Sequence, residues 1–200
     1  MTTTPARPRV APGRPGATSH AAIEQAAFGL FAARGFAGTT LDDIAAAVGV
    51  GRRTLFRYYR SKNDIPWGQF DRTLDDFRRI LDTTPDGLPL WEAVHRGVVR
   101  FNEFPGDARP GHRERMTLIL GTSELQAHSA LRYAEWRAVI ASYAAARLGL
   151  APTDLVPTTV GHVSLALALA AYEAWLRDPG RPLAGLVDEA MLGLRTHLAC

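Results

Sequence analysis

The chain has 200 residues, of which 46% are hydrophobic, so it has enough apolar side chains for a packed core and is not expected to be disordered throughout. Its single cysteine, Cys200, excludes an intrachain disulfide framework and a zinc site built from several cysteines. The net charge of +3 is unevenly distributed, because residues 1–62 carry nine basic and three acidic residues, so a polyanion is expected to bind near the start of the chain.

The first segment, residues 2–17, contains four prolines and no apolar run, which predicts a disordered basic arm (1–17) and not a secretory signal. Its arginines, Arg7, Arg9 and Arg14, could follow a phosphate backbone or lie in a minor groove, and a solvated tail is the alternative. The most apolar stretch, 163–172, is too short to cross a bilayer. A cytoplasmic protein without a membrane partner is therefore expected.

The first predicted helix begins after Thr18 or Ser19 as N-cap and continues to Arg34, with Gly35 as its stop signal. Its apolar residues from Ile23 to Phe31 recur at the spacing of one helix face.

A second, shorter helix is predicted from Thr40, where Asp43 completes a variant of the capping box, to Gly49. A third is predicted from about Gly51 to Tyr59. Two short helices joined by three or four residues that include glycine are typical of a helix-turn-helix.

The third helix carries the charge that DNA binding needs. With Leu55 and Tyr59 facing the core, its other side chains face outward and offer donors suited to guanine edges and phosphate oxygens. These outward residues are Arg52, Arg53, Thr54, Arg57 and Tyr58. A basic run of this kind can also be an ordinary solvated face, and the capped helix before it and the +6 charge of residues 1–62 favour the DNA interpretation.

A fourth helix is predicted over residues 64–82, with Pro66 tolerated in its first turn. Beyond the turn at Thr84–Gly87, five apolar-periodic segments are separated by proline and glycine turns. They cover roughly 89–103, 111–121, 123–148, 154–176 and 183–198. No alternating strand pattern and no internal repeat is found, so the predicted fold class is all-α.

The run from Ala33 to Lys62 resembles the TetR-type regulators through three elements: Gly35-Phe36-Ala37-Gly38-Thr39-Thr40 with Ile44-Ala45, Thr54-Leu55-Phe56-Arg57-Tyr58-Tyr59, and Ser61-Lys62. The resemblance is strong over about residues 18–65. It implies a three-helix helix-turn-helix domain (18–63) followed by a helical ligand-binding and dimerisation domain (64–200).

What the resemblance implies for DNA contact is specific. Thr40 and Lys62 match phosphate-contacting positions, Tyr58 matches a position touching phosphate or base, and Arg52 to Thr54 match the base-reading start of the recognition helix. Two departures are Phe56, where a tyrosine is more usual, and Gly51, where a serine N-cap is common; glycine is only slightly the weaker cap. With Phe56 available to a thymine methyl, the predicted DNA-binding residues are Thr40, Arg52, Arg53, Thr54, Phe56, Arg57, Tyr58 and Lys62.

Residues Ser61–Gly68 with Phe70-Asp71 resemble the regulators associated with mycofactocin biosynthesis, which implies a C-terminal domain of an acyl-CoA-sensing type. The expected effector is therefore a small apolar ligand such as a long-chain acyl-CoA. The candidate ligand-binding residues are Phe101, Phe104, Arg109, Arg113, Met116, Leu120, Trp136, Ile140 and Tyr143, with Leu125 a further pocket candidate. A basic cluster of Arg109, His112, Arg113 and Arg115 could hold CoA phosphates. The alternatives are ordinary core for the apolar residues and ordinary surface for the basic ones.

Segments 154–176 and 183–198 are the predicted dimer interface, and two-fold symmetry implies a near-palindromic double-stranded operator. An enzyme is disfavoured because the six histidines form no H-E-x-x-H motif and no nucleophile elbow, Walker loop or dinucleotide fingerprint is present. The pair Glu92 and His95 has di-iron spacing but lacks a second such pair. No metal, cofactor or catalytic residue is expected. A ligand-independent DNA-binding protein remains the other alternative.

Overall fold

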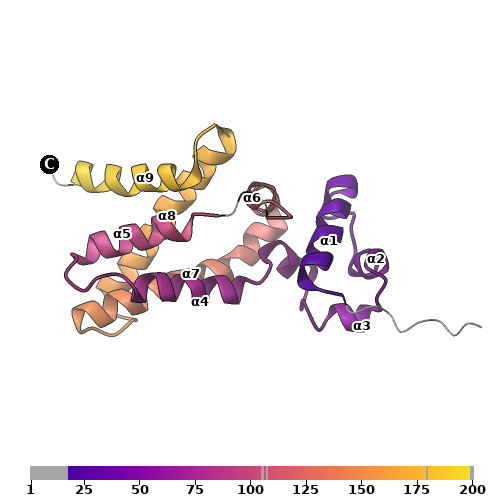
Figure 1. The fold of residues 1–200 in the computed structure, drawn as a ribbon, viewed down its shortest axis with the longest axis horizontal. Coiled ribbons are helices and arrows are strands. Elements are labelled where there is room, and N and C mark those ends of the chain that lie inside the picture. The colour runs from indigo at the N-terminus through magenta and orange to yellow at the C-terminus, as the bar shows by residue number, and fades with distance from the viewer. Residues whose placement is uncertain (1–17, 105, 107, 179, 199–200) are drawn as a thin grey trace, which may run out of the picture. The chain divides into compact units, whose positions relative to one another are not determined.

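The structure is a computed structural model, and it describes residues 18–104, 106, 108–178 and 180–198. Within these ranges all regular structure is helical (Figure 1), which confirms the all-α prediction. The chain forms two compact units, Met1–Ser61 and Lys62–Cys200. The predicted arm, with Arg7, Arg9 and Arg14, lies outside the described residues.

The N-terminal unit contains α1 (His20–Arg34), α2 (Leu41–Ala47) and α3 (Arg52–Leu55). Helix α1 begins where the Ser19 hydroxyl accepts a hydrogen bond from the Ala22 N–H (3.2 Å) and ends at Gly35, whose φ of 75° suits glycine. Helix α2 begins at the predicted capping box, in which Thr40 and Asp43 satisfy each other's backbone N–H groups.

A small core holds these three helices together. Leu55 and Tyr59 are almost fully buried, as their spacing predicted. The other buried apolar residues of this unit come from α1, from α2 and from the turn between them, namely Ile23, Ala27, Phe28, Phe31, Phe36, Ile44 and Ala45. The Tyr59 hydroxyl donates a 2.6 Å hydrogen bond to the buried Glu24 carboxylate, and the buried Thr39 hydroxyl donates to the Gly35 carbonyl at 2.9 Å, so these two buried polar side chains are paired.

The third helix is shorter than predicted. Regular α-helix ends at Leu55 and not at Tyr59, and residues 56–58 continue as a tighter turn. In this turn the Arg57 and Tyr58 N–H groups bond to carbonyls three residues back. The hydrogen bonds that Tyr58 and Tyr59 make to Thr18 and Glu24 fix the end of the segment from outside, so tertiary contacts override the helical pattern.

The predicted fourth helix, 64–82, is two elements: a 3-10 helix η1 (Lys62–Trp67) and α4 (Phe70–Asp82). The break falls at Gly68, which has a φ of 59°. Pro66 has no N–H to donate to an α-helical ladder, which explains why the first piece adopts a short 3-10 form.

The remaining helices of the C-terminal unit follow the predicted segments closely. They are α5 (Leu90–Phe101), α6 (His112–Gly121), α7 (Ser123–Leu148), α8 (Leu155–Arg177) and α9 (Leu183–Leu198). Helices α7 and α8 lie close together at Gly161, where an added Cβ would lie 2.8 Å from the Arg137 carbonyl oxygen. Glycine is therefore needed there for packing.

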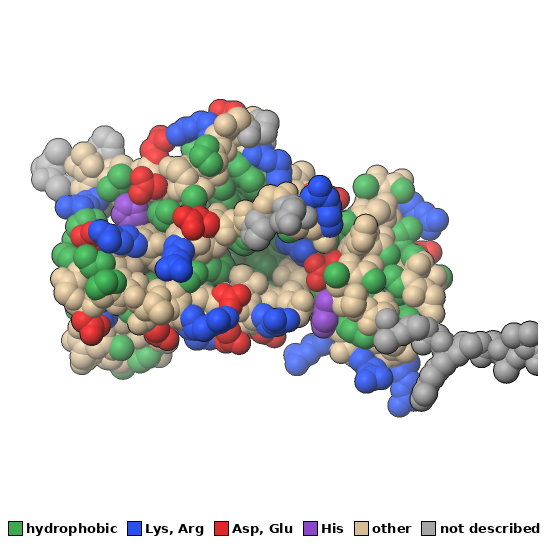
Figure 2. Space-filling model, in the orientation of Figure 1, with side chains coloured by type: hydrophobic (Ala, Val, Ile, Leu, Met, Phe, Trp, Pro, Cys, Tyr) green, Lys and Arg blue, Asp and Glu red, His purple; other side chains and the backbone are tan. Residues whose placement is uncertain are grey.

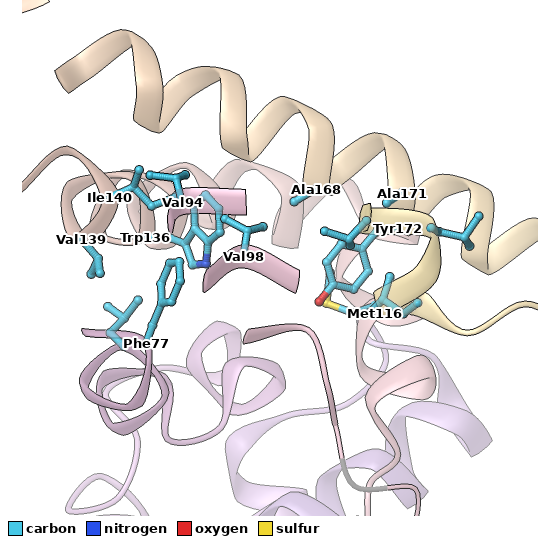
Figure 3. Close-up of a cluster of buried hydrophobic side chains, with 14 of the residues drawn as sticks. Phe77, Val94, Val98, Met116, Trp136, Val139, Ile140, Ala168, Ala171 and Tyr172 are labelled. Atoms are coloured by element: carbon cyan, nitrogen blue, oxygen red, sulfur yellow. The ribbon is translucent and has the colours of Figure 1, made fainter. Parts of the chain in front are cut away.

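The core of the C-terminal unit is formed by α4 to α9. In Figure 3 the rings of Phe77 and Trp136 lie together, with a centroid distance of 5.2 Å, and Met116 lies beside Tyr172. Helix α8 is long and apolar enough to cross a membrane by length and composition, but only 33% of its most apolar window is buried within the unit.

Candidate DNA-binding surface and ligand-binding core

The predicted recognition segment presents a basic surface. Figure 2 shows Lys and Arg side chains gathered over α3 of the N-terminal unit. Arg52, Arg53 and Arg57 are exposed, while Leu55 and Tyr59 hold the segment from behind. Rigid presentation of exposed guanidinium groups is what bidentate contact with guanine edges requires.

The arginines of this surface are not equivalent. Arg52 forms a 3.0 Å ion pair with Asp42 of α2, and its guanidinium also lies 5.5 Å from the centre of the Phe56 ring. Among the described residues no carboxylate lies within ion-pair distance of Arg53. Arg52 therefore already has a carboxylate partner on this surface, whereas Arg53 has none in the part of the chain that the structure describes.

The exposed Thr40 has a double role at the start of α2. Its hydroxyl accepts from the Asp43 N–H and donates to the Asp43 carboxylate at 2.6 Å. Hydrogen bonds from Thr40, first from its side chain and then from its backbone, lower the pKa of Asp43. A phosphate at Thr40 would compete with Asp43 for the hydroxyl hydrogen.

The two aromatic candidates differ in exposure. Phe56 is 44% exposed and thus open to contact with a thymine methyl group. Tyr58 is half-buried, and its hydroxyl donates a 2.7 Å hydrogen bond to the Thr18 carbonyl. Thr54 and Lys62 are likewise partly exposed, and Lys62 begins η1 in the C-terminal unit.

The apolar candidates for ligand binding from Phe101 to Tyr143 lie in or against one core, apart from Leu125. Met116, Trp136 and Ile140 are buried, and Phe101, Phe104, Leu120 and Tyr143 pack against the same cluster. Leu125 is also fully buried. The face of the C-terminal unit in view in Figure 2 is hollowed between α4 and α6, and hydrophobic side chains form the base of this hollow. The apolar candidates are thus brought together in the structure.

The basic cluster, in contrast, is not arranged as a set of paired guanidinium groups. Arg113 donates a 2.6 Å hydrogen bond to the Trp175 carbonyl and lies 4.0 Å from the centre of that ring. Arg115 donates to the carbonyls of Ile65 and Pro66. Arg109 is exposed, and its guanidinium donates to the Ala108 carbonyl.

The fourth member of that cluster, His112, belongs to the interior. Its ring stacks on Phe104 with centroids 3.5 Å apart, and its Nε2 lies 2.8 Å from the Tyr172 hydroxyl. The Tyr172 hydroxyl donates to Asn102 Oδ1 at 2.8 Å, so the histidine nitrogen must donate to the Tyr172 oxygen. Burial, and secondarily Arg115, lowers the pKa of His112 to about 3. The imidazole is therefore neutral at physiological pH.

We expect this buried histidine to make folding stability pH-dependent. Because the pKa of His112 is lower in the folded state (about 3) than in the unfolded state (6.5), the unfolded chain takes up the proton first as pH falls below 6.5. Relative to a His112→Gln variant, the wild type should lose up to about 1.4 kcal/mol of unfolding free energy per pH unit between pH 6.5 and 4. Urea titrations of both proteins between pH 6.5 and 4 measure this loss. Parallel pH profiles of their unfolding free energies would contradict a buried, neutral His112.

A second concave region of the C-terminal unit lies between α5 and α9. It is a groove of about 390 Å³, lined among others by Trp91, His95 and Asp188, and the His95 Nε2 lies 2.8 Å from the Asp188 carboxylate. Glu92 also lines this groove, and Arg96 is its ion-pair partner. Among the described residues no group of three or more potential metal ligands occurs.

The carboxylates that form ion pairs with the basic residues of the two units were not identified from the sequence. Asp42, the partner of Arg52, and Asp64, which lies 3.0 Å from both His128 and Arg132, were not singled out. The only signal for Asp42 was its acidic character within the basic segment 1–62, and Asp64 lies just beyond that segment. Pairings between residues far apart in the chain depend on the fold, so a single sequence does not reveal them.

Known protein families match both the N-terminal and the C-terminal part of the chain. The family model described as bacterial regulatory proteins of the tetR family matches residues 23–65, and the model described as the MftR C-terminal domain matches residues 88–199. The chain is 47% identical over 166 residues to MftR of Mycobacterium tuberculosis, described as a transcriptional regulator of mycofactocin biosynthesis. This match covers 83% of the chain and 84% of the relative.

Solved structures share the fold at lower identity. The repressor FadR of Thermus thermophilus, solved with lauroyl-CoA, is 24% identical with a TM-score of 0.55, over 90% of this chain and 93% of that one. SmeT, the repressor of a Stenotrophomonas maltophilia multidrug efflux pump, is 21% identical with a TM-score of 0.58, over 91% and 89% of the two chains. These relatives are regulators and not enzymes.

Proposed function

Because this chain belongs to the TetR family of bacterial DNA-binding transcriptional regulators, with a C-terminal domain of the MftR type, we propose that it is a repressor released by a long-chain acyl-CoA. In this proposal a homodimer binds a near-palindromic operator in the cytoplasm, and the effector binds residues 64–200. The observation that carries it is the fixed basic surface on α3, within a chain 47% identical to a regulator.

The DNA contacts proposed for this chain divide into two kinds. Arg52, Arg53 and Thr54 face the base edges of the major groove, with Phe56 against a thymine methyl. Thr40, Arg57, Tyr58 and Lys62 meet the phosphate backbone and set the register. Two-fold symmetry repeats both sets on the second half-site.

We propose α8 and α9 as the dimer interface. The exposed residues of α8 include large apolar side chains, with Leu155 80%, Val156 53% and Val163 39% exposed. Exposed residues also recur along one stripe of α8, at His162, Ala166 and Ala170. The large apolar side chains exposed on α8 are costly in water, and covering them between two copies is favourable.

Ala166→Glu is expected to weaken this dimer, because it places a charge in the middle of the exposed α8 stripe without entering the core of the protomer. Sedimentation velocity should show at least a tenfold higher dissociation constant, with the helical content unchanged. The matched control is Ala127→Glu on the exposed face of α7. A variant with the same dimer dissociation constant as the wild type would exclude this part of α8 from the interface.

The acyl-CoA proposal has two supports. The related fold of FadR is described in complex with lauroyl-CoA, and the apolar candidates of this chain lie in or against one hydrophobic core. Figure 2 shows hydrophobic side chains at the base of the hollow in the same unit. We propose that Phe101, Phe104, Met116, Leu120, Trp136, Ile140 and Tyr143 separate to admit the acyl chain. Arg113 contacts the Trp175 carbonyl and ring, so the exposed Arg109 is the better placed of the two for CoA phosphates.

The effector acts by its different affinity for two conformations of the dimer. The DNA-bound conformation holds the recognition segments at operator spacing, and ligand favours a second conformation with another spacing. We propose that η1 and α4 carry the change, because they directly follow the helix-turn-helix in the chain and α4 supplies Phe77 to the core. A crosslink from α4 to α7 that left ligand-induced release unchanged would contradict this role.

A pull-down of genomic fragments with the purified protein, with and without a panel of acyl-CoAs, tests the proposal. Enrichment of one near-palindromic site that a long-chain acyl-CoA releases is the expected result. Enrichment that no acyl-CoA affects would refute the effector while keeping the regulator. Salt-dependent binding without sequence preference would indicate a ligand-independent DNA-binding protein instead.

A further inference from the structure

Two hydrogen-bond donors in the C-terminal unit are buried without an acceptor. The Trp67 indole N–H of η1 and the Tyr133 hydroxyl of α7 make no hydrogen bond of normal geometry to the described residues, although the Ser129 side chain lies close enough to Tyr133 to lower the pKa of its hydroxyl. Most buried donors in folded proteins are paired, so two unpaired ones in one unit call for an explanation. The two side chains are neighbours, with ring centroids 5.7 Å apart and nearly perpendicular planes.

The surroundings of this donor pair are apolar and carry no uncompensated charge. The Phe70 ring of α4 lies 5.1 Å from Trp67, and both pack against the core that contains the candidate ligand residues. The nearby Arg132 is engaged by Asp64 and Glu135. Burial raises the pKa of Tyr133, with the Ser129 hydroxyl acting in the opposite direction, so the phenol remains a donor.

Two neutral donors in an apolar setting suit a neutral acceptor with two lone pairs, which describes a carbonyl oxygen. An ionised carboxylate would need a charged partner to offset its desolvation. The two arginines near the pair are already engaged, Arg132 by carboxylates and Arg115 by the Ile65 and Pro66 carbonyls. The thioester carbonyl of an acyl-CoA is an acceptor of the required kind.

Trp67 lies in η1, the helix that directly follows the N-terminal unit in the chain. Its 3-10 helix is fastened to α6, where the Arg115 guanidinium binds the Ile65 and Pro66 carbonyls, and to α7, where His128 and Arg132 bind Asp64. The same helix begins one residue after Ser61, at the end of the DNA-binding unit. A ligand atom held by Trp67 therefore acts on the element that connects the two units of the chain.

We propose that Trp67 and Tyr133 together bind the acyl carbonyl oxygen of the effector and thereby distinguish acyl thioesters from other apolar ligands. This inference rests on the proposed acyl-CoA response. It assigns a polar recognition site to two residues that were not among the candidate ligand-binding residues.

The test compares lauroyl-CoA with S-dodecyl-CoA, a thioether with the same chain length and no acyl carbonyl. Isothermal titration calorimetry is carried out on the full-length wild type and on Trp67→Phe and Tyr133→Phe, which keep an aromatic ring and remove the donor. The wild type should bind lauroyl-CoA about tenfold or more tightly than the thioether. Each variant should lose about 3- to 10-fold in lauroyl-CoA affinity, with thioether affinity unchanged.

Trp91→Phe is the matched control, because it makes the same exchange at an exposed site on α5 and should leave both affinities unchanged. Thermal melting confirms that each variant is folded. Equal losses for both ligands would indicate altered packing, and no loss at all would indicate donors satisfied by water; either result overturns the proposal. Wild type that binds neither ligand refutes the acyl-CoA effector itself, and the carbonyl site with it, before any variant is compared.

Discussion

Replacing Arg53 with alanine is expected to lower the affinity for the operator by about 5- to 150-fold. A bidentate contact between arginine and a guanine edge contributes roughly 1–3 kcal/mol of discrimination. Arg53 is exposed at the start of the recognition segment and has no competing carboxylate among the described residues, so this full contribution should be lost. Fluorescence anisotropy with the enriched site and with random DNA measures the affinity and the discrimination separately.

Two further replacements give this experiment its controls. Lys62→Ala should weaken operator and random DNA alike and reduce the salt slope by about one, because a phosphate contact carries no base information. Arg52→Ala should cost less than Arg53→Ala, since the wild type must first break the ion pair with Asp42. Equal losses on operator and random DNA for Arg53→Ala would contradict a base-reading role.

Replacing Asp64 with alanine is expected to lower the free energy of unfolding by about 3 kcal/mol. Asp64 is buried in η1, and its carboxylate lies 3.0 Å from both His128 and Arg132 of α7. Its removal leaves a mostly buried guanidinium with one fewer partner, which is among the costly changes in a protein interior. Because Arg132 retains Glu135, the loss should fall at the low end of the range for broken buried pairs.

Asp71 offers a matched control on the same arginine. Its carboxylate lies 3.6 Å from Arg132, but its side chain is 89% exposed, against 12% for Asp64. Surface pairs of this kind contribute little, so Asp71→Ala should change the free energy of unfolding by less than about 0.5 kcal/mol. Urea unfolding at a fixed protein concentration measures both variants. Similar small effects at the two positions would show that burial does not strengthen the Asp64 pair.

Elements with a strong local signal were predicted well. The Thr40–Asp43 capping box, the stop at Gly35 and the five helical segments beyond residue 88 appear in the structure close to their predicted positions. Each depends on side chains within one or two helical turns, which a sequence displays directly. The recognition segment and the fourth helix were predicted too long. Tyr58 and Tyr59 form hydrogen bonds to Thr18 and Glu24, which end the first, and the positive φ of Gly68 interrupts the second between η1 and α4.

The predicted site residues show the same difference between features set by local sequence and features set by tertiary contacts. Exposure of Arg52, Arg53 and Arg57 followed from the buried positions of Leu55 and Tyr59, because a helical turn fixes both faces at once. The basic residues that are clustered in the sequence around residue 112 contact different parts of the structure. Its histidine is buried against Phe104 and Tyr172, and Arg113 and Arg115 bind carbonyls 49 to 62 residues away in the chain.

By itself, the sequence determined the all-α class, the order of the helices and the basic recognition surface, because periodicity, capping and charge are local properties. Only the tertiary structure decided which groups meet: Asp42 with Arg52, Asp64 with His128 and Arg132, and Trp67 with Tyr133. The physical reason is that hydrogen bonds and ion pairs act over a few ångströms. Their partners are therefore set by how helices pack, and not by how far apart the residues stand in the chain.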